Sequence, residues 1–314
     1  MGTFTKPFEE LTRSDVPDAG GKGASLGEMT RAGIPVPPGF VVLTPAFRRF
    51  ILENQLADDI SSPLKKFDPH DAEAAEVISE QIRNAMMKAV LPHELAEEIT
   101  KDFRGLNVPF VAVRSSATAE DTGKTSWAGE LDSYLNTTEK DLLENVKRCW
   151  SSLFTPRALH YRAEHGLLEM DITVAVVVQV MVNSEVSGIV FTAHPVTKDR
   201  DMLVLEAAFG LGEAIVQGMI TPDTYIINKK DLTIFDTNIG TQSKKIIRNE
   251  RGHNETIELS EEEGSRRALP ESVILDIAKL AMRIERHYGH PQDIEFAHEA
   301  GKTFIVQSRP ITTL

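Results

Sequence analysis

The residues Asp293-Ile294-Glu295-Phe296-Ala297, followed by Phe304-Ile305-Val306-Gln307-Ser308-Arg309, give the clearest structural signal in this chain. Their alternation of polar and apolar side chains predicts two short strands, which residues 299–302 join into a β-hairpin. Residues two apart share a face of a strand, and the polar face carries the following side chains: Asp293, Glu295 and Ala297 from the first strand, and Ile305, Gln307 and Arg309 from the second. We therefore expect a hairpin with a mainly polar face.

The length of the turn decides which residues face each other across this hairpin. A three-residue connection, with Gly301 in the left-handed conformation, would place Glu295 opposite Gln307. A two-residue turn would place Glu295 opposite Val306 instead. In the first register two oxygen ligands have Cβ atoms about 5 Å apart, with Arg309 one step along the same face. This set suits one Mg²⁺ that bridges phosphates, although an exposed hairpin of ordinary polar residues would show the same pattern.

The composition is that of a soluble globular protein. The chain has 314 residues, of which 41% are hydrophobic and 26% charged, and this length suffices for two domains or one unit with two lobes. Its net charge of −13 argues against a nucleic-acid surface, because a phosphate backbone needs a broad basic patch. An anionic ligand must therefore be held by a few placed cations, helped by a metal ion.

The sequence also predicts where the protein resides. Residues 1–10 lack the apolar core of a signal peptide, and no apolar run approaches the length of a membrane span. The single cysteine, Cys149, cannot form an internal disulfide, and its apolar helical surroundings predict a buried thiol. We expect a cytoplasmic protein that binds neither a membrane nor a nucleic acid.

Helices and strands follow one another without a regular strand–helix–strand repeat, which predicts an α+β fold rather than a Rossmann-type sheet. A helix is expected to begin at Thr44, with Thr44 as its N-cap and Pro45 as its first residue. The other expected helices cover residues 24–32, 68–104 with a break at Pro92, 141–154, 158–165 and 272–288. Besides the hairpin, the expected strands cover residues 39–43, 108–114, 172–181, 188–192, 203–207 and 224–227.

The segment Gly20-Gly21-Lys22-Gly23 precedes a predicted helix. Small residues and an ammonium at the positive end of a helix can accept a phosphate through backbone N–H groups and Lys22. The segment is not a Walker A loop, because no lysine followed by serine or threonine stands at the required glycine spacing. A tight turn with an exposed lysine would explain the same residues.

A second candidate is Arg114, which ends the predicted strand 108–114 just before the hydroxyl-rich loop 115–129. Few large apolar residues anchor this loop, so it should move easily and could fold over a transferring phosphoryl group held by Arg114. The alternative is that Arg114 pairs at the surface with Glu120 or Asp121.

The end of the long strand 172–181 is the third candidate, because an apolar strand meets polar residues there. Gln179, Met181 and Val182 could form a hinge whose backbone reads an adenine edge, and Glu185 would then be within reach of a ribose. An ordinary strand end would have the same sequence.

Five motifs occur in one order between residues 20 and 311. They are Gly20-Gly21-Lys22-Gly23-Ala24-Ser25-Leu26-Gly27-Glu28-Met29, Val113-Arg114-Ser115-Ser116-Ala117-Thr118-Ala119-Glu120-Asp121, Ser187-Gly188-Ile189-Val190-Phe191-Thr192, Phe209-Gly210-Leu211-Gly212-Glu213 and Val306-Gln307-Ser308-Arg309-Pro310. Together they resemble the ATP-binding domain shared by phosphoenolpyruvate synthase, pyruvate phosphate dikinase and rifampin phosphotransferase. The resemblance covers essentially the whole chain.

The resemblance implies an ATP-grasp fold, in which two α+β lobes, residues 1–181 and 182–314, hold ATP and Mg²⁺ in a cleft between them. It implies roles for these residues: Lys22, Arg114 and Arg309 as catalytic cations on the phosphates, Gly129 and Glu213 in the nucleotide site, Gln179, Met181 and Val182 on adenine, Glu185 on ribose, and Glu295 and Gln307 on Mg²⁺.

The resemblance also implies an activity and partners. In this family the ATP domain passes phosphoryl groups to a histidine on a separate swivelling domain, which hands one to pyruvate or another acceptor and leaves AMP and phosphate. No Thr-Ser-His segment of a swivelling domain appears in the sequence, and an acceptor-binding barrel alone would need about 250 residues. We therefore expect an excised domain or a free-standing subunit with a partner that supplies the histidine.

Two positions depart from the family pattern. Glu130 stands where the family's glycine loop usually has glutamine, and a carboxylate there would repel a polyphosphate unless it is protonated or metal-bound. His194 stands where the family commonly has aspartate, and a residue just before Pro195 is poorly placed to carry phosphate between two sites. A nucleotide-binding regulatory or assembly subunit with little catalysis, and an ATP-grasp carboxylate ligase, are the two alternative functions.

Overall fold

The computed structural model describes residues 3–118, 131–168, 172–312 and 314. The chain divides into two compact units, one formed by Met1–Glu28 and Pro38–Met181 and the other by Met29–Pro37 and Val182–Leu314. Each unit contains a β-sheet and helices, and its strands pair antiparallel, so the predicted α+β class is confirmed. The functional lobes 1–181 and 182–314 stay a prediction.

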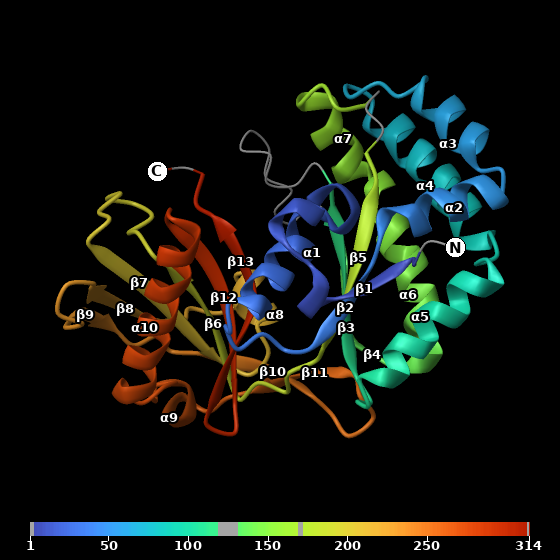
Figure 1. The fold of residues 1–314 in the computed structure, drawn as a ribbon. Coiled ribbons are helices and arrows are strands. Elements are labelled where there is room, and N and C mark those ends of the chain that lie inside the picture. Colours follow the sequence, from blue (N-terminus) through green and yellow to red (C-terminus); the bar gives the residue numbers. More distant parts are fainter. Residues whose placement is uncertain (1–2, 119–130, 169–171, 313) are drawn as a thin grey trace. The chain divides into compact units, whose positions relative to one another are not determined.

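The first unit is built on a five-stranded sheet with the strand order β1-β2-β5-β3-β4 (Figure 1). Its strands are β1 (Thr5–Pro7), β2 (Gly39–Val42), β3 (Val111–Ala117), β4 (Ser133–Thr137) and β5 (Val174–Val180). The central strand β5 pairs with β2 on one side and with β3 on the other, and it is buried from Val174 to Gln179.

Helices cover one face of this sheet and enclose the main core. They are α2 (Thr44–Glu53), α3 (Ala57–Leu64), α4 (Ala72–Lys88), α5 (His93–Gly105), α6 (Glu139–Ser151) and α7 (Pro156–Glu164), with the short 3₁₀ helix η3 (Ser152–Phe154) between the last two. Trp150 is fully buried in this core, where its ring lies 5.1 Å from the ring of Phe50. Val113 and Val178 reach the same core from the sheet.

The other face of the sheet meets helix α1 (Val16–Arg31), which follows the 3₁₀ helices η1 (Phe8–Glu10) and η2 (Arg13–Asp15). Ser116 on β3 fixes this contact, because its Oγ donates to Ala19 O at 2.9 Å and accepts from Gly23 N at 3.1 Å. Gly20 interrupts the helix with φ +68°, and a Cβ there would lie 2.3 Å from Ser116 Oγ. Glycine is therefore required where α1 crosses β3.

Two predicted details of the first unit are wrong. The N-cap of α2 is Leu43, and Thr44 instead donates its hydroxyl to Pro17 O at 3.2 Å, within the fold. The strand containing Arg114 does not end at that residue, because Ser115, Ser116 and Ala117 continue to pair with β5. The hydroxyl of Ser115 is satisfied by Asp132 O at 3.0 Å, so a polar residue is tolerated inside the strand.

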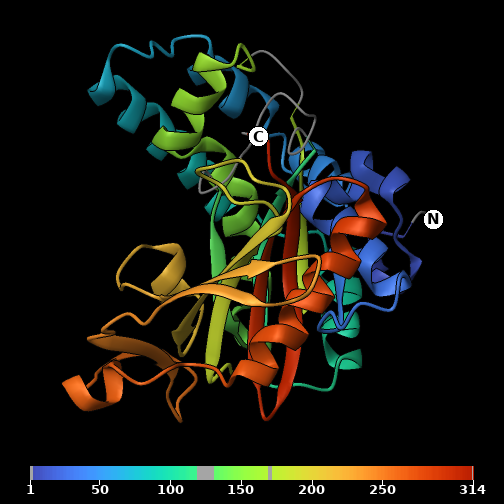
Figure 2. The ribbon, with the colours of Figure 1, turned by 90° about the vertical axis from the view of Figure 1, so that its left-hand side faces the viewer.

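The second unit is built on a six-stranded sheet with the order β13-β12-β6-β7-β8-β9. Its strands are β6 (Val186–Phe191), β7 (Met202–Phe209), β8 (Asp223–Asn228), β9 (Ile234–Asn238), β12 (Gln292–Glu299) and β13 (Lys302–Pro310). Helix α10 (Glu271–Tyr288) runs along one face of the sheet and packs against β12 and β7 (Figure 2). A separate ribbon of β10 (Lys244–Arg248) and β11 (Asn254–Glu258) and the short helices α8 (Glu213–Val216) and α9 (Glu261–Gly264) complete the unit.

The C-terminal hairpin is formed by β12 and β13, and Glu295 lies opposite Gln307 as predicted. The predicted three-residue connection is wrong, because Glu299 pairs with Lys302 around a two-residue turn in which Ala300 and Gly301 have φ of 50° and 75°. Both left-handed residues match the turn type that fits the twist of a hairpin. A two-residue turn alone would pair Glu295 with Val306. A shift of the strand register between Glu295 and Phe296 pairs Glu295 with Gln307 instead.

The extra residue in this shift is Val306, since Phe296 pairs with Ile305 while Glu295 pairs with Gln307. It forms a β-bulge, which places two residues opposite one. Ile305 is consequently paired with Phe296 and is 1% exposed, as Phe296 is. The prediction that Ile305 shares a face with Gln307 and Arg309 is therefore wrong, because the bulge breaks the alternation.

Candidate functional site

Lys22 lies on α1 between Ala19 and Gly23, the two residues of this helix that hydrogen-bond to Ser116. Its Nζ donates to the backbone oxygen of Ser115 at 2.8 Å, which holds the ammonium group against β3. The glycine-rich part of α1 thus brings the helix backbone and a lysine close to β3, while the predicted phosphate contact of Lys22 stays a prediction.

Arg114 lies in the middle of β3, on the face of the sheet that α1 meets. Its Nη1 donates to Gln179 Oε1 at 3.4 Å. Gln179 pairs with Ala112, which lies two residues before Arg114 in β3, so Arg114 and Gln179 share a face of the sheet. The predicted position of Arg114 at a strand-to-loop junction is wrong, since β3 continues for three more residues. Its neighbourhood with Gln179 could not be predicted from the sequence.

Gln179 carries a buried amide beside Arg114, on the face of the sheet that α1 meets. Its side chain is 2% exposed, and its Nε2 has no hydrogen-bond partner among the described residues. A buried donor without a partner costs roughly 1–3 kcal/mol, so such groups are normally satisfied by protein, water or a ligand. The amide of Gln179 is therefore suited to donate to an acceptor atom of a bound molecule.

The segment that follows β5 is held by backbone hydrogen bonds. Met181 N donates to Phe110 O at 3.1 Å, and Val182 is buried. A contact from this segment to an adenine edge must therefore use backbone atoms other than the Met181 amide.

In the second unit the polar face of the hairpin carries an ion pair beside Glu295 and Gln307. Arg309 donates from Nε and Nη2 to Asp293 Oδ2 at 2.9 and 2.7 Å, as expected for residues paired across β12 and β13. Two hydrogen bonds to one carboxylate fix the direction of a guanidinium. Arg309 is 32% exposed at the side chain, so its outer edge can still contact a ligand.

Asp293, which the strand alternation predicted on this face, has a further acidic neighbour in Glu206, which no sequence motif indicated. Ile189 pairs with both Glu295 and Glu206, so these two carboxylates share a face of the sheet. Burial raises the pKa of Glu206, and the charge of Asp293 raises it further. Burial also raises the pKa of Asp293, against the opposing effect of Arg309.

Asp293, Glu295 and Glu206 thus lie on one face of the sheet, beside the guanidinium of Arg309. Signals for Asp293 and Glu206 were present in the sequence. Asp293 alternates with Glu295 in the same strand, and Glu206 is a charged residue within the apolar run of β7. The register across three strands, which brings Glu206 into line with Glu295, could not be read from the chain.

Two further predicted residues lie near the other end of the second sheet. Glu185 has an exposed side chain, while its backbone is fixed by bonds from its N to His298 O at 2.9 Å and from Gly210 N to its O at 2.8 Å. Glu213 opens helix α8, and its carboxylate accepts from Asn254 Nδ2 at 2.5 Å and from Gln217 Nε2 at 3.1 Å. Gly129, Glu120, Asp121 and Glu130 lie outside the described residues.

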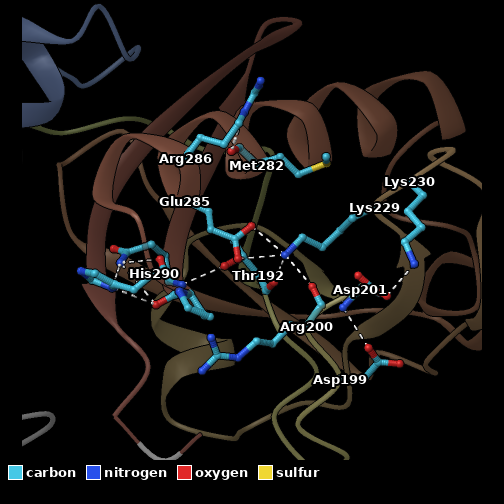
Figure 3. A network of polar contacts seen from close by, with 12 residues as sticks. Thr192, Asp199, Arg200, Asp201, Lys229, Lys230, Met282, Glu285, Arg286 and His290 are labelled. Carbon is cyan, nitrogen blue, oxygen red and sulfur yellow. Dashed lines mark hydrogen bonds and ion pairs between the residues drawn. The ribbon is translucent and has the colours of Figure 1, made fainter.

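The start of β12 is anchored by a network around Lys229 (Figure 3). Lys229 Nζ pairs with Glu285 Oε2 at 2.7 Å and donates to the backbone oxygens of Thr192 and Arg200, both at 2.8 Å. Thr192 Oγ1 in turn accepts from Gln292 N at 2.8 Å. Lys229, which directly follows β8, thus links α10 to the loop after β6 and so supports the strand that carries Asp293 and Glu295.

His194, at the position where the related motif has aspartate, serves as a turn acceptor. Its Nδ1 accepts from Val196 N at 3.2 Å and from Thr197 N at 3.3 Å. An aspartate oxygen makes the same local bonds in a turn, so the imidazole replaces that carboxylate structurally. Acceptance at Nδ1 places the proton of the neutral ring on Nε2.

Among the described residues, no group of three or more histidine, cysteine, aspartate or glutamate side chains is arranged to hold a metal ion. Mg²⁺ needs no such group, because it is usually bound by one or two protein oxygens together with waters and phosphates. No helix in the described parts of the chain is both long enough and apolar enough to cross a membrane.

Comparison with known proteins identifies relatives of nearly the whole chain. The family model described as "Pyruvate phosphate dikinase, AMP/ATP-binding domain" matches residues 16–314. The chain is 44% identical to a probable phosphoenolpyruvate synthase of Methanocaldococcus jannaschii, over 99% of this chain and 27% of the relative. It is 45% identical to a probable phosphoenolpyruvate synthase of Archaeoglobus fulgidus, over 97% of this chain and 41% of the relative.

A phosphoenolpyruvate synthase of Pyrococcus furiosus is 41% identical to the chain, over 99% of this chain and 44% of the relative. The chain thus spans between about a quarter and less than half of the length of the curated relatives it matches.

Proposed function

Since this chain belongs to the family of the pyruvate phosphate dikinase AMP/ATP-binding domain, we propose that it binds Mg-ATP and transfers phosphoryl groups to a histidine on a separate swivelling domain or subunit. The fold would be an ATP-grasp fold, with the nucleotide held between lobes 1–181 and 182–314. Its relatives named phosphoenolpyruvate synthase are two to four times longer, so an acceptor-binding domain for pyruvate or another small molecule would be a further partner.

The first unit would supply cations and a buried amide to the nucleotide. Lys22 and Arg114 would contact the phosphates, with Gly129 from the intervening loop. Gln179, Met181 and Val182 would contact adenine, and Glu185 the ribose. The unpartnered Nε2 of the buried Gln179 supports this assignment, because adenine nitrogens are acceptors.

The second unit would supply the binding site for Mg²⁺. Glu295 and Gln307 are a carboxylate and an amide placed opposite each other, which is the oxygen donor set that Mg²⁺ prefers. The raised pKa values of Glu206 and Asp293 also fit a cation, because a positive charge would offset the cost of their burial. Mg²⁺, when bound, would neutralise charge on the phosphate oxygens.

Phosphoryl transfer depends mainly on positioning and on charge stabilisation. Lys22, held at the Ser115 carbonyl, and Arg309, held by Asp293, would each present a cation in a fixed direction. Arg114 would stabilise charge on the transferring group, and Glu213 would complete the nucleotide site. The observation that carries the proposal is the pairing of Glu295 with Gln307 beside Arg309.

The test is product analysis with Mg-ATP and a supplied phosphohistidine domain of a phosphoenolpyruvate synthase. We expect AMP, inorganic phosphate and a phosphorylated histidine. Arg114→Ala should abolish transfer while ATP still binds appreciably, and undiminished transfer by this variant would refute its role. Arg157→Ala, which removes a half-exposed arginine of the same unit from outside this face, is the matched control.

The two alternatives give different products. A regulatory or assembly subunit would bind ATP without forming AMP. A carboxylate ligase of the ATP-grasp type would form ADP and an acyl phosphate, and it would need no histidine domain.

A further inference from the structure

A pocket lies in the first unit, between helices α2, α3 and α7 and the residues that precede β5. Its volume is about 770 Å³, which is within the range of pockets that hold small ligands. Its walls are apolar side chains that include Ile51, Leu52, Ile60, Leu64 and Phe67. Leu52 is 77% exposed at the rim, so an apolar ligand could gain contacts there without displacing the core.

The charged side chains that line this pocket in the described part of the chain are all basic. Its described lining residues include Arg48, Lys65 and Arg162 and no carboxylate, although acidic residues outnumber basic ones 47 to 34 in the chain. Arg48 and Lys65 are exposed, and neither pairs with a carboxylate among the described residues. The mouth of an apolar pocket is thus locally basic on an acidic protein.

Arg162 adds a positive charge at the inner wall. It is 3% exposed, and it donates from Nη2 to Leu168 O at 3.1 Å while its guanidinium carbon lies 5.8 Å from the centre of the Phe154 ring. Burial lowers the pKa of Arg162 to about 10, so the group keeps its charge at neutral pH.

The pocket is separate from the nucleotide-binding face proposed for this unit. Phe47 and Phe154, which line it, belong to the core on the side of the sheet with Val178. Lys22 and Arg114 lie on the opposite side, where α1 meets β3 through Ser116. A ligand in the pocket would therefore not compete with ATP for the same side chains.

We infer that this pocket binds an amphipathic organic anion, with a carboxylate headgroup at the mouth beside Arg48 and Lys65 and an alkyl tail among the apolar side chains of α2 and α3. Charge complementarity selects the headgroup, and the apolar walls select the tail. Two comparison compounds separate these contributions. Acetate has the carboxylate headgroup without an alkyl tail, and a quaternary alkylammonium has the alkyl tail with a headgroup of the opposite charge.

The test is calorimetric titration of the chain with decanoate, acetate and decyltrimethylammonium, without and with Mg-ATP. We expect decanoate to bind with one-to-one stoichiometry and at least tenfold more tightly than either comparison compound, with the same affinity when Mg-ATP is present. Equal binding of decanoate and decyltrimethylammonium, or competition between decanoate and Mg-ATP, would overturn the inference.

Charge-reversal variants locate the headgroup. Arg48→Glu with Lys65→Glu changes two exposed side chains, so the fold should persist, and it should weaken decanoate binding at least tenfold. Lys88→Glu with Lys101→Glu makes the same change in net charge on α4 and α5, away from the pocket, and should leave the affinity within twofold. An equal loss in both double variants, or in neither, contradicts the assignment. Ala57→Trp, at an exposed lining position, should block binding independently of charge.

Discussion

Glu295 lies opposite Gln307 across the C-terminal hairpin, although the turn that closes the hairpin would by itself place Glu295 opposite Val306. The β-bulge at Val306 accounts for the difference, because it adds one residue to β13 between the turn and Gln307. The bulge thus brings a carboxylate and an amide together on the face that also carries Arg309 and Asp293. Bulges often have this effect near binding sites.

This relationship predicts different outcomes for two single-residue deletions. Deleting Val306 removes the bulge but leaves Gln307 next to Ile305 in the chain, so Gln307 remains opposite Glu295. Deleting Gln307 shortens the strand equally but puts Val306 opposite Glu295. We expect Mg-ATP affinity, measured by calorimetry, to stay within about threefold after the first deletion and to fall at least tenfold after the second, or about 1.4 kcal/mol. Equal losses in both variants would show that the pairing does not determine the affinity.

The backbone at Gly20 predicts a local effect on stability. Gly20→Ala puts a Cβ 2.3 Å from Ser116 Oγ at a positive φ, so the free energy of unfolding should fall by about 1–3 kcal/mol. Gly105→Ala is the matched control, since a Cβ there meets nothing within 4 Å and φ is not positive, and it should be neutral or stabilising. Urea unfolding of both variants checks this, and similar values for the two would contradict it.

The buried carboxyl of Glu206 predicts a pH dependence. Its pKa in the folded protein is raised above the ordinary value of 4.5, so its ionisation destabilises the fold as pH rises through that raised pKa. Glu206→Gln should therefore increase the free energy of unfolding at pH 7. Below pH 4.5 the carboxyl is protonated in both folded and unfolded states, and the gain should vanish. Urea unfolding at pH 7 and at pH 4 measures it, and an equal gain at both values would contradict the role of ionisation.

The sequence predicted elements whose signal is local. The alternation from Asp293 to Ala297 indicated β12, and the long run of valines indicated β5. The turn length was wrong because Phe304-Ile305-Val306 is a continuous apolar run, in which a bulged residue looks like any other strand residue. A two-residue turn with a bulge and a three-residue turn can be told apart only when the residue-by-residue pairing of β12 with β13 is known.

The candidate site was harder to predict, because it depends on contacts between distant segments. The end of β3 was misplaced since Ser115 and Ser116 look like loop residues until their hydroxyls are seen to donate to Asp132 O and Ala19 O. Likewise, Glu206 joins the acidic face only through Ile189 on an intervening strand. Spacing along the chain carries no information on such neighbours.

The most direct test of the magnesium site proposed on the hairpin measures how much Mg²⁺ increases the affinity for ATP. Calorimetric titrations with ATP, one series in Mg²⁺ and one in EDTA, give this increase. We expect Mg²⁺ to tighten binding at least tenfold in the unmodified chain and in Glu255→Ala, which removes an exposed carboxylate on β11. In Glu295→Ala this gain should disappear while the affinity in EDTA is retained. An unchanged gain from Mg²⁺ in Glu295→Ala would contradict the account.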